Sequence, residues 1–192
     1  KVPQLISQFR RLKNCTVELD DYFRSISNFK EKLGTVFLQM NENYRPKNFE
    51  DLKHFIEQWP TDVPLSVELR HTDWYTDASI AKELNDMLAQ NKVCHTITDT
   101  AGRRDIIHMR LTNNQCFIRF TGANHPSDVD RLDEWFERLT EWKEQGIEQI
   151  NIFIHQTVEK DLQMLSARLA ERINKEWGYN LTVPGGEQGS LF

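Results

Sequence analysis

The amino-acid sequence predicts an α/β fold in which a parallel sheet is covered by helices. Short apolar runs, typical of buried strands, alternate along the 192 residues with longer segments whose apolar residues recur at helical spacing. Helices that follow strands in this way are typical of right-handed crossovers between parallel strands. No low-complexity linker divides the chain, and we therefore expect a single domain over residues 1–192.

The predicted strands are short apolar runs that finish in polar or charged side chains. They lie near residues 35–40, 65–70, 93–99, 116–121 and 150–155. Helical stripes of apolar residues are predicted over residues 19–33, 49–59, 80–88, 129–142 and 162–173. Gly34, Gly146 and Gly178 stand where helices are expected to end, and Pro60 stops the second stripe.

One interval between strands, residues 100–115, has no clear helical stripe. It contains "DIIHMRL" followed by "TNNQ", in which the paired Asn residues tolerate a turn conformation. Two interpretations are therefore open from the residues alone, a hairpin and an irregular crossover.

The composition excludes several classes of function. Lys and Arg total 24 against 29 for Asp and Glu, and no basic stripe is present, so we expect no nucleic-acid partner. The chain has no run of 18 apolar residues and no leader-like segment, so we expect no membrane partner and a cytoplasmic location. Its three cysteines form no CxxC motif, and no glycine-rich phosphate loop or dinucleotide fingerprint occurs, so no cofactor is expected.

Polar side chains gather where the predicted strands end. Ligands of parallel α/β proteins bind at this edge, because the loops there open toward a common crevice. Side chains alternate across a strand, so residues two apart, such as His95, Ile97 and Asp99, share a face. We expect the following residues to converge, pointing inward, at this edge: Gln39, Glu68, Arg70, Asp99, Arg119 and His155.

Five segments in order resemble the bacterial DUF72 (YecE-like) family: "LGTVFLQMN", "VELRHTDWYTD", "TITDT", "FIRFTG" and "GEQGSLF". The most specific part is Glu-x-Arg-His with a Trp three residues on, supported by the strand-terminal Arg119 with Gly122. The resemblance implies a TIM-type (β/α) barrel of uncharacterised activity, in which residues 100–115 would be an irregular crossover. One departure is "FIHQT" after the last strand, where the family has an Asn-rich ending.

The beginning of the chain bears on the completeness of this barrel. Lys1 and Pro3 resemble the Lys-x-Pro that closes the family's third strand, so the two strands before it are absent from the sequence. A complete barrel of eight strands needs about 250 residues. We therefore expect an N-terminally truncated, incomplete barrel with an open sheet edge, which another chain or further polypeptide would cover.

The candidate residues suggest two functional classes. In the first, an enzyme of hydrolase, lyase or isomerase type acts on a small anionic substrate, with Glu68, Asp99 and His155 as catalytic acids and bases. In the second, a non-catalytic binding or scaffold protein uses the same charges as structural ion pairs, since buried charges require partners. Whether the chain is an enzyme stays open between these classes.

The expected substrate-binding residues are Gln39, Arg70, His71, Trp74 and Arg119. Arg70 and Arg119 provide guanidinium groups that suit carboxylate or phosphate oxygens. His71 either contacts the substrate or caps the backbone of the following loop. Trp74 either lines the pocket or packs under its loop. No metal is expected, because two guanidinium groups would oppose a cation among Glu68, Asp99 and His155.

Overall fold

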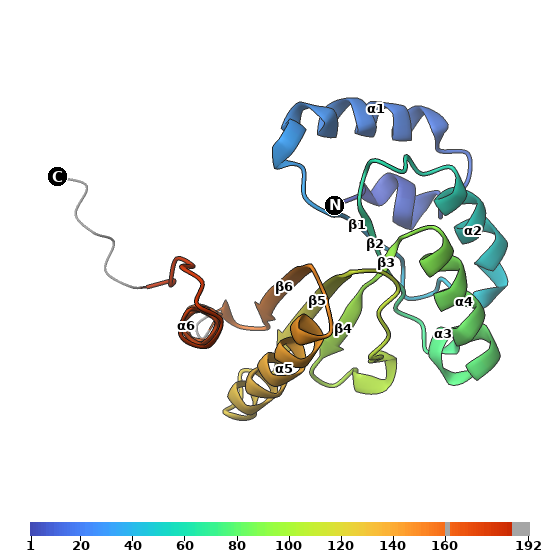
Figure 1. The fold of residues 1–192 in the computed structure, drawn as a ribbon. Coiled ribbons are helices and arrows are strands. Elements are labelled where there is room, and N and C mark those ends of the chain that lie inside the picture. Colours follow the sequence, from blue (N-terminus) through green and yellow to red (C-terminus); the bar gives the residue numbers. More distant parts are fainter. Residues whose placement is uncertain (160–161, 186–192) are drawn as a thin grey trace.

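The computed structural model describes residues 1–159 and 162–185 (Figure 1). Its strands are β1 (Val36–Gln39), β2 (Leu65–Glu68), β3 (Cys94–His95), β4 (Ile97–Thr100), β5 (Gln115–Gly122) and β6 (Gln149–Gln156). Its α-helices are α1 (Thr16–Ile26), α2 (Phe49–Glu57), α3 (Asp73–Thr76), α4 (Ala78–Gln90), α5 (Ser127–Glu144) and α6 (Leu162–Trp177). Shorter helical turns are η1 (Leu5–Phe9), η2 (Ser27–Lys32), η3 (Pro46–Asn48) and η4 (Arg104–Ile106).

The strands form two parallel sheets of three strands, in the orders β1-β2-β3 and β4-β5-β6. The α/β class with parallel strands is confirmed, but a TIM barrel is not, because the two sheets are separate. The predicted strand at 93–99 is divided at Thr96, whose amide still donates to Val67 O of β2 at 2.9 Å. Beyond it, Ile97 takes Ile118 of β5 as its partner, so the segment changes sheets within one residue.

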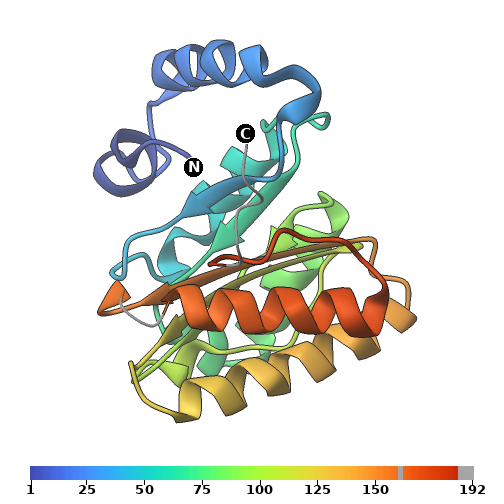
Figure 2. The ribbon, with the colours of Figure 1, turned by 90° about the vertical axis from the view of Figure 1, so that its left-hand side faces the viewer.

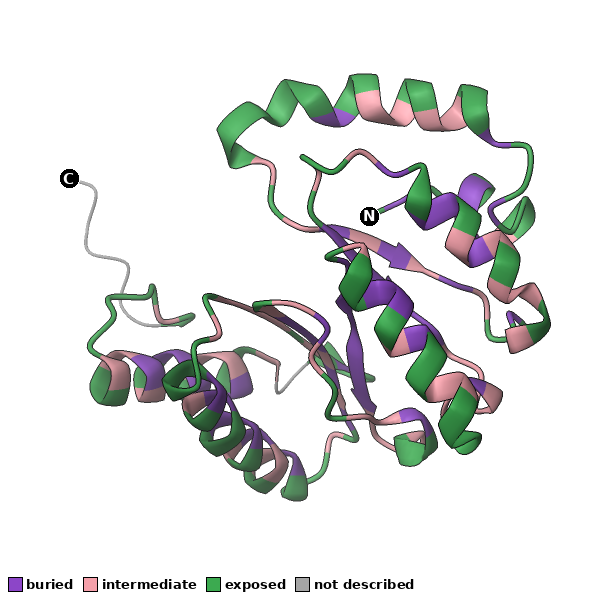
Figure 3. Ribbon diagram, turned by 45° about the vertical axis from the view of Figure 1, so that its right-hand side comes forward, coloured by how far each residue is buried: buried purple, intermediate pink, exposed green. Residues whose placement is uncertain are grey.

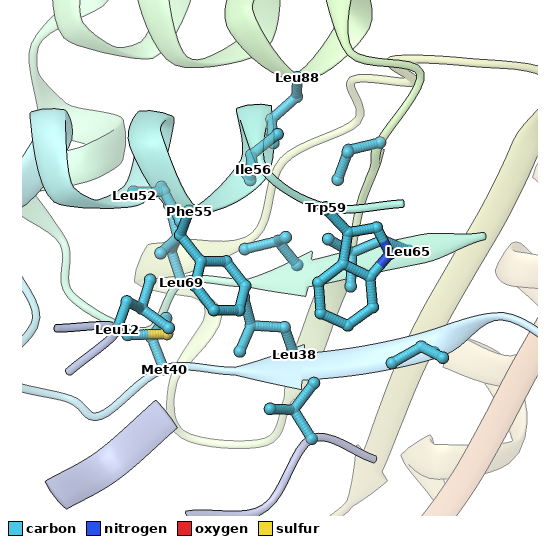
Figure 4. Close-up of a cluster of buried hydrophobic side chains, with 14 of the residues drawn as sticks. Leu12, Leu38, Met40, Leu52, Phe55, Ile56, Trp59, Leu65, Leu69 and Leu88 are labelled. Atoms are coloured by element: carbon cyan, nitrogen blue, oxygen red, sulfur yellow. The ribbon is translucent and has the colours of Figure 1, made fainter. Parts of the chain in front are cut away.

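Each sheet has its own hydrophobic core on the side that faces the helices. The first core lies between β1 and β2 and the helices α2 and α4, where large side chains such as Leu38, Phe55 and Leu88 are buried (Figure 4). The second lies between β5, β6 and the helices α5 and α6, which run side by side along that sheet (Figure 2). The helices bury the side that faces the strands and expose the other (Figure 3), as amphipathic helices do.

The helical stripes of the sequence are confirmed by α1 with η2, α2, α4, α5 and α6. The left-handed φ angles of Gly146 (101°) and Gly178 (73°) end α5 and α6, because a residue without a side chain adopts this conformation at little cost. Between β4 and β5 the chain forms only the turn η4, so the irregular crossover is confirmed and the hairpin alternative is wrong.

The sequence predicted the end of a strand at Lys1–Pro3 and a family-like segment at the C-terminus. Lys1–Pro3 lies beside β1, where the amide of Val2 donates to Phe37 O at 2.8 Å, but it forms no strand. The C-terminal "GEQGSLF" segment, residues 186–192, lies outside the described residues.

Candidate active site

The candidate site lies on the inner face of the sheets, which we define as the face opposite the helices. Leu38, Val67 and Ile118 are fully buried in the two cores, against the helices. Side chains alternate along a strand, so Gln39, Glu68 and Arg119, one residue further on, occupy the inner face. All three stand in the C-terminal half of their strands, as the sequence predicted.

Glu68 is the centre of this site. Its side chain has no exposed surface, and its Oε1 accepts hydrogen bonds from Arg119 Nη1 at 2.6 Å and Thr98 Oγ1 at 2.8 Å. Its Oε2 accepts from Gln39 Nε2 at 2.5 Å. Three donors from three strands thus offset the loss of hydration of a buried carboxylate. The arrangement fixes the position of Arg119 more firmly than a surface ion pair would.

The site contains more positive than negative charge. Lys1 Nζ donates to Gln39 Oε1 at 2.8 Å, and Gln39 connects it to Glu68 and so to Arg119. Lys1 and Arg119 carry two positive charges, and the carboxylate of Glu68 balances one of them. The only bond from the Arg119 side chain to another described residue comes from Nη1, and the side chain is 22% exposed. Nε and Nη2 therefore remain available to an anion.

An aromatic row lies beside these charges on the inner face. Phe117 stands between Phe37 and Phe153, with ring centroids 5.2 Å and 4.9 Å away and interplanar angles of 14° and 29°. The guanidinium of Arg119 and the ammonium of Lys1 lie 5.6 Å and 5.8 Å from the centroid of Phe37. The row therefore joins the inner faces of the two sheets and contacts both cations.

His155 stands on the inner face near the end of β6, and its side chain is exposed. Desolvation lowers the pKa of its imidazole from the usual 6.5, with a further lowering by the charge of Arg119 and an opposing effect of Glu68. The ring is therefore neutral at neutral pH and carries a lone pair that can accept a proton. The register pairs His155 with Thr121, two residues beyond Arg119, so the side chains of His155 and Arg119 stand on the same inner face, as predicted.

Asp99 does not join the site, and its predicted position is corrected. Its Oδ1 accepts from Arg131 Nη2 at 2.6 Å and its Oδ2 from Trp135 Nε1 at 2.8 Å, both on α5. Asp99 does share a face with Ile97, as predicted, but this is the face against the helices. The apolar Ile97, fully buried in the second core, is the signal that could have shown this. Thr98 holds the inner position instead, and was missed.

Three further candidates, Arg70, His71 and Trp74, follow β2. The sequence predicted that they bind substrate together with Arg119, but each is engaged elsewhere. Arg70 is paired with Glu42 at 2.5 Å. His71 Nδ1 accepts from the amide of Asp73 at 3.1 Å and caps the following turn. Trp74 is completely buried and donates from Nε1 to Tyr44 O at 2.7 Å, so it packs in the first core beneath its loop.

The loop after β5 is not a second anion site. The amides of Ala123 and His125 point at the carboxylate of Asp128 in α5, at 2.9 Å and 3.2 Å, and Gln156 binds the same group. These bonds to backbone amides, with Gln156 and the Arg131 charge, outweigh desolvation and lower the pKa of Asp128. A built-in carboxylate therefore occupies the place where a parallel strand and helix often bind phosphate.

Within residues 1–159 and 162–185, no group of three or more His, Cys, Asp or Glu side chains could hold a metal ion. None of the helices described is long and apolar enough to cross a membrane.

The family model described as "Protein of unknown function DUF72" matches residues 1–187. The chain belongs to the DUF72 family. The resemblance drawn from the sequence is therefore confirmed, and it brings no established activity with it.

Curated relatives of the chain include the "UPF0759 protein YecE" of Escherichia coli, from strains K12 and O157:H7. Each is 26% identical over an alignment of 161 residues, and the match covers 74% of this chain and 59% of the relative. The chain thus spans 59% of the length of the curated relatives it matches.

Two solved structures of DUF72 family proteins resemble the fold. One, from Enterococcus faecalis V583 at 2.52 Å resolution, has a TM-score of 0.64 and 17% identity over 89% of this chain and 73% of that one. The other, from Thermotoga maritima MSB8 at 2.20 Å, has a TM-score of 0.61 and 17% identity over 80% and 64%. At such identities the similarity concerns the fold alone.

Proposed function

We propose that this DUF72 chain belongs to an enzyme, of hydrolase, lyase or isomerase type, that acts on a small anionic substrate at the C-terminal ends of its strands. The observation that carries the proposal is the guanidinium of Arg119, which Glu68 holds by one nitrogen while Nε and Nη2 stay available. A fixed guanidinium with open donors suits a carboxylate or phosphate. The excess positive charge that Lys1 adds favours the same class of ligand.

In this proposal Arg119, Gln39, Glu68 and His155 have separate roles. Arg119 binds the anion, and Gln39 and Glu68 position Arg119. His155, neutral at neutral pH and exposed on the same face, accepts a proton from the substrate or from water and returns it. Glu68 acts as a positioning residue, because both of its oxygens already accept hydrogen bonds from protein groups.

A non-catalytic binding or scaffold protein is the second candidate. The complete burial of Glu68 and its three donors favour it, since a saturated buried ion pair also stabilises a fold. The two candidates differ at the side chain of His155, which makes no hydrogen bond to another described residue and so stabilises no described part of the scaffold.

The wider setting is part of the proposal. Parallel strands in sequential order are compatible with a segment of a TIM-type barrel, and further polypeptide or another chain would cover its open sheet edge. A cytoplasmic location is supported by Cys15, Cys94 and Cys116, which are all free and buried.

Turnover and binding by variants test this function. Candidate phosphate esters and small carboxylic acids are supplied as substrates. Turnover is detected as proton release, and exchange of C–H protons as loss of their NMR signals in D₂O. We expect His155→Gln to lower kcat by about 100-fold or more with binding retained, as for loss of a general base. Arg119→Gln raises KM by about tenfold or more, as for the loss of one charged hydrogen bond.

The matched controls are His54→Gln and Arg24→Gln, because both side chains lie exposed on helices away from the inner face. Anion binding that depends on Arg119 without any turnover would support the scaffold candidate. Turnover that neither His155→Gln nor Arg119→Gln changes would exclude this site.

A further inference from the structure

We infer that the anionic group recognised by Arg119 is carried on a planar apolar body, such as an aromatic ring, that stacks on Phe153. This inference rests on the proposed function and adds the class of substrate to it. The probe that represents this class most simply is benzoate, a carboxylate attached directly to a ring.

The first observation is the position of Phe153 relative to Arg119. The two residues are partners in the parallel register of β5 and β6, so their side chains leave the sheet side by side on the inner face. Neighbouring strands lie about 4.8 Å apart. A ring placed on Phe153 therefore brings a carboxylate attached to it within reach of the open Nε and Nη2 of Arg119.

The second observation is that the aromatic row has one capped end and one open end. Phe37 is capped by the cations of Lys1 and Arg119, and Phe117 in the middle is 3% exposed. Phe153 uses one side to stack on Phe117 and is still 46% exposed. Aromatic pairs favour offset stacks at centroid separations of about 4.5–7 Å, so a further ring continues the row.

The third observation concerns the surroundings of this open end. His155 follows Phe153 by two residues on the same face of β6, about 7 Å along the strand. Apolar contact, a fixed guanidinium and a neutral imidazole thus meet at one place. A planar anion uses all three, whereas an inorganic anion uses only the charge and a neutral ring only the apolar contact.

Binding of small probes tests the inference. Benzoate, acetate and benzyl alcohol, with inorganic phosphate as reference, are titrated at low ionic strength and followed by NMR. We expect benzoate to bind about tenfold more tightly than acetate, the gain of one stacked and partly buried ring. Phe153→Leu should reduce benzoate affinity to that of acetate and leave acetate and phosphate unchanged. Phe9→Leu is the matched control, because Phe9 is 76% exposed on η1.

Two results would overturn the inference while the anion site stands. One is that phosphate binding depends on Arg119 while benzoate and acetate bind with equal affinity. The exposed ring of Phe153 would then serve as a contact for a covering polypeptide rather than for a substrate. The other is unchanged benzoate affinity in Phe153→Leu. A result in which phosphate, acetate and benzoate all bind independently of Arg119 would instead remove the proposed anion site, and this inference with it.

Discussion

At the scale of single residues, Glu68 shows how local context decides the role of a charge. A strand-terminal glutamate near arginines is equally typical of a catalytic acid and of a structural ion pair. The structure gives it no exposed surface and three donors, from Arg119, Thr98 and Gln39. Its partner Arg119 is only partly buried. The chemistry available to a ligand therefore belongs to the arginine rather than to the glutamate.

Replacement of Arg119 tests this division. We expect Arg119→Gln to lower the free energy of unfolding by about 1.5–3 kcal/mol, the range for hydrogen bonds to charged groups. Glu68 would lose one charged donor but keep those of Thr98 and Gln39, and water already reaches Arg119. Urea unfolding measures the change, with Arg24→Gln as the control that leaves stability unaltered. A loss above about 4 kcal/mol with unchanged anion binding would favour the scaffold candidate.

At the scale of elements, the regular parts of the chain were predictable and the junctions were not. The stripes on α2, α4, α5 and α6 follow from the helical period, because each helix must bury one face. The division of the third strand at Thr96 had no local signal, since it arises from the pairing of its two halves with different neighbours. The buried Ile97 indicates which face of the strand Asp99 occupies, because the two residues are two positions apart. The partners of Asp99, Arg131 and Trp135 on α5, could not be predicted, because they are distant in sequence.

The irregular crossover between β4 and β5 is held by stacked rings rather than by a helix. His108 of the crossover stacks on His95 with a centroid separation of 3.9 Å, and both stack on Tyr75. His108 Nε2 bonds to Thr96 O at 3.1 Å, and His95 Nδ1 to Asn85 Oδ1 at 2.9 Å. Desolvation lowers the pKa of His108 to about 4, and desolvation with the charge of His108 lowers the pKa of His95 well below 6.5.

These two histidines predict a loss of stability in acid. Both are neutral when folded, and the unfolded chain takes up protons as the pH falls through about 6.5. The folded state should therefore be most stable above pH 6.5 and lose stability on going down to about pH 4. For His108 the loss is on the order of 3 kcal/mol, from a pKa that falls from 6.5 to about 4.

Unfolding by urea between pH 4 and 7 measures this dependence. His108→Gln keeps a donor for Thr96 O but cannot be protonated, so its stability should depend less steeply on pH than that of the parent chain. His54→Gln, at an exposed helical position, should retain the full dependence. Identical pH dependence in the parent and His108→Gln would refute the neutral, stacked state of these rings.

At the scale of the whole molecule, the site depends on how the two sheets face each other. The α/β class and the sequential parallel order follow from alternating periods along the chain. The contact of Phe37 with Phe117, and of Thr35 Oγ1 with Gln115 Oε1 at 3.0 Å, joins strands some 80 residues apart. Such contacts depend on how the two sheets are placed relative to each other, and no local pattern encodes them. For this reason the sequence located Arg119 and Glu68, and alternation put Phe37, Phe117 and Phe153 on the faces of Gln39, Arg119 and His155, but the contact between the three rings was not predicted.

The central claim is that Arg119 binds a small anion on the inner face, and NMR of arginine side chains tests it most directly. Inorganic phosphate is titrated into the chain with ¹⁵N-labelled arginine, with assignment by Arg119→Lys and Arg24→Lys. The account predicts a saturable shift of the Arg119 Nε–H signal, while the Arg24 signal moves little. An Arg119 signal that stays unchanged up to high phosphate, or that moves only in parallel with Arg24, would contradict it.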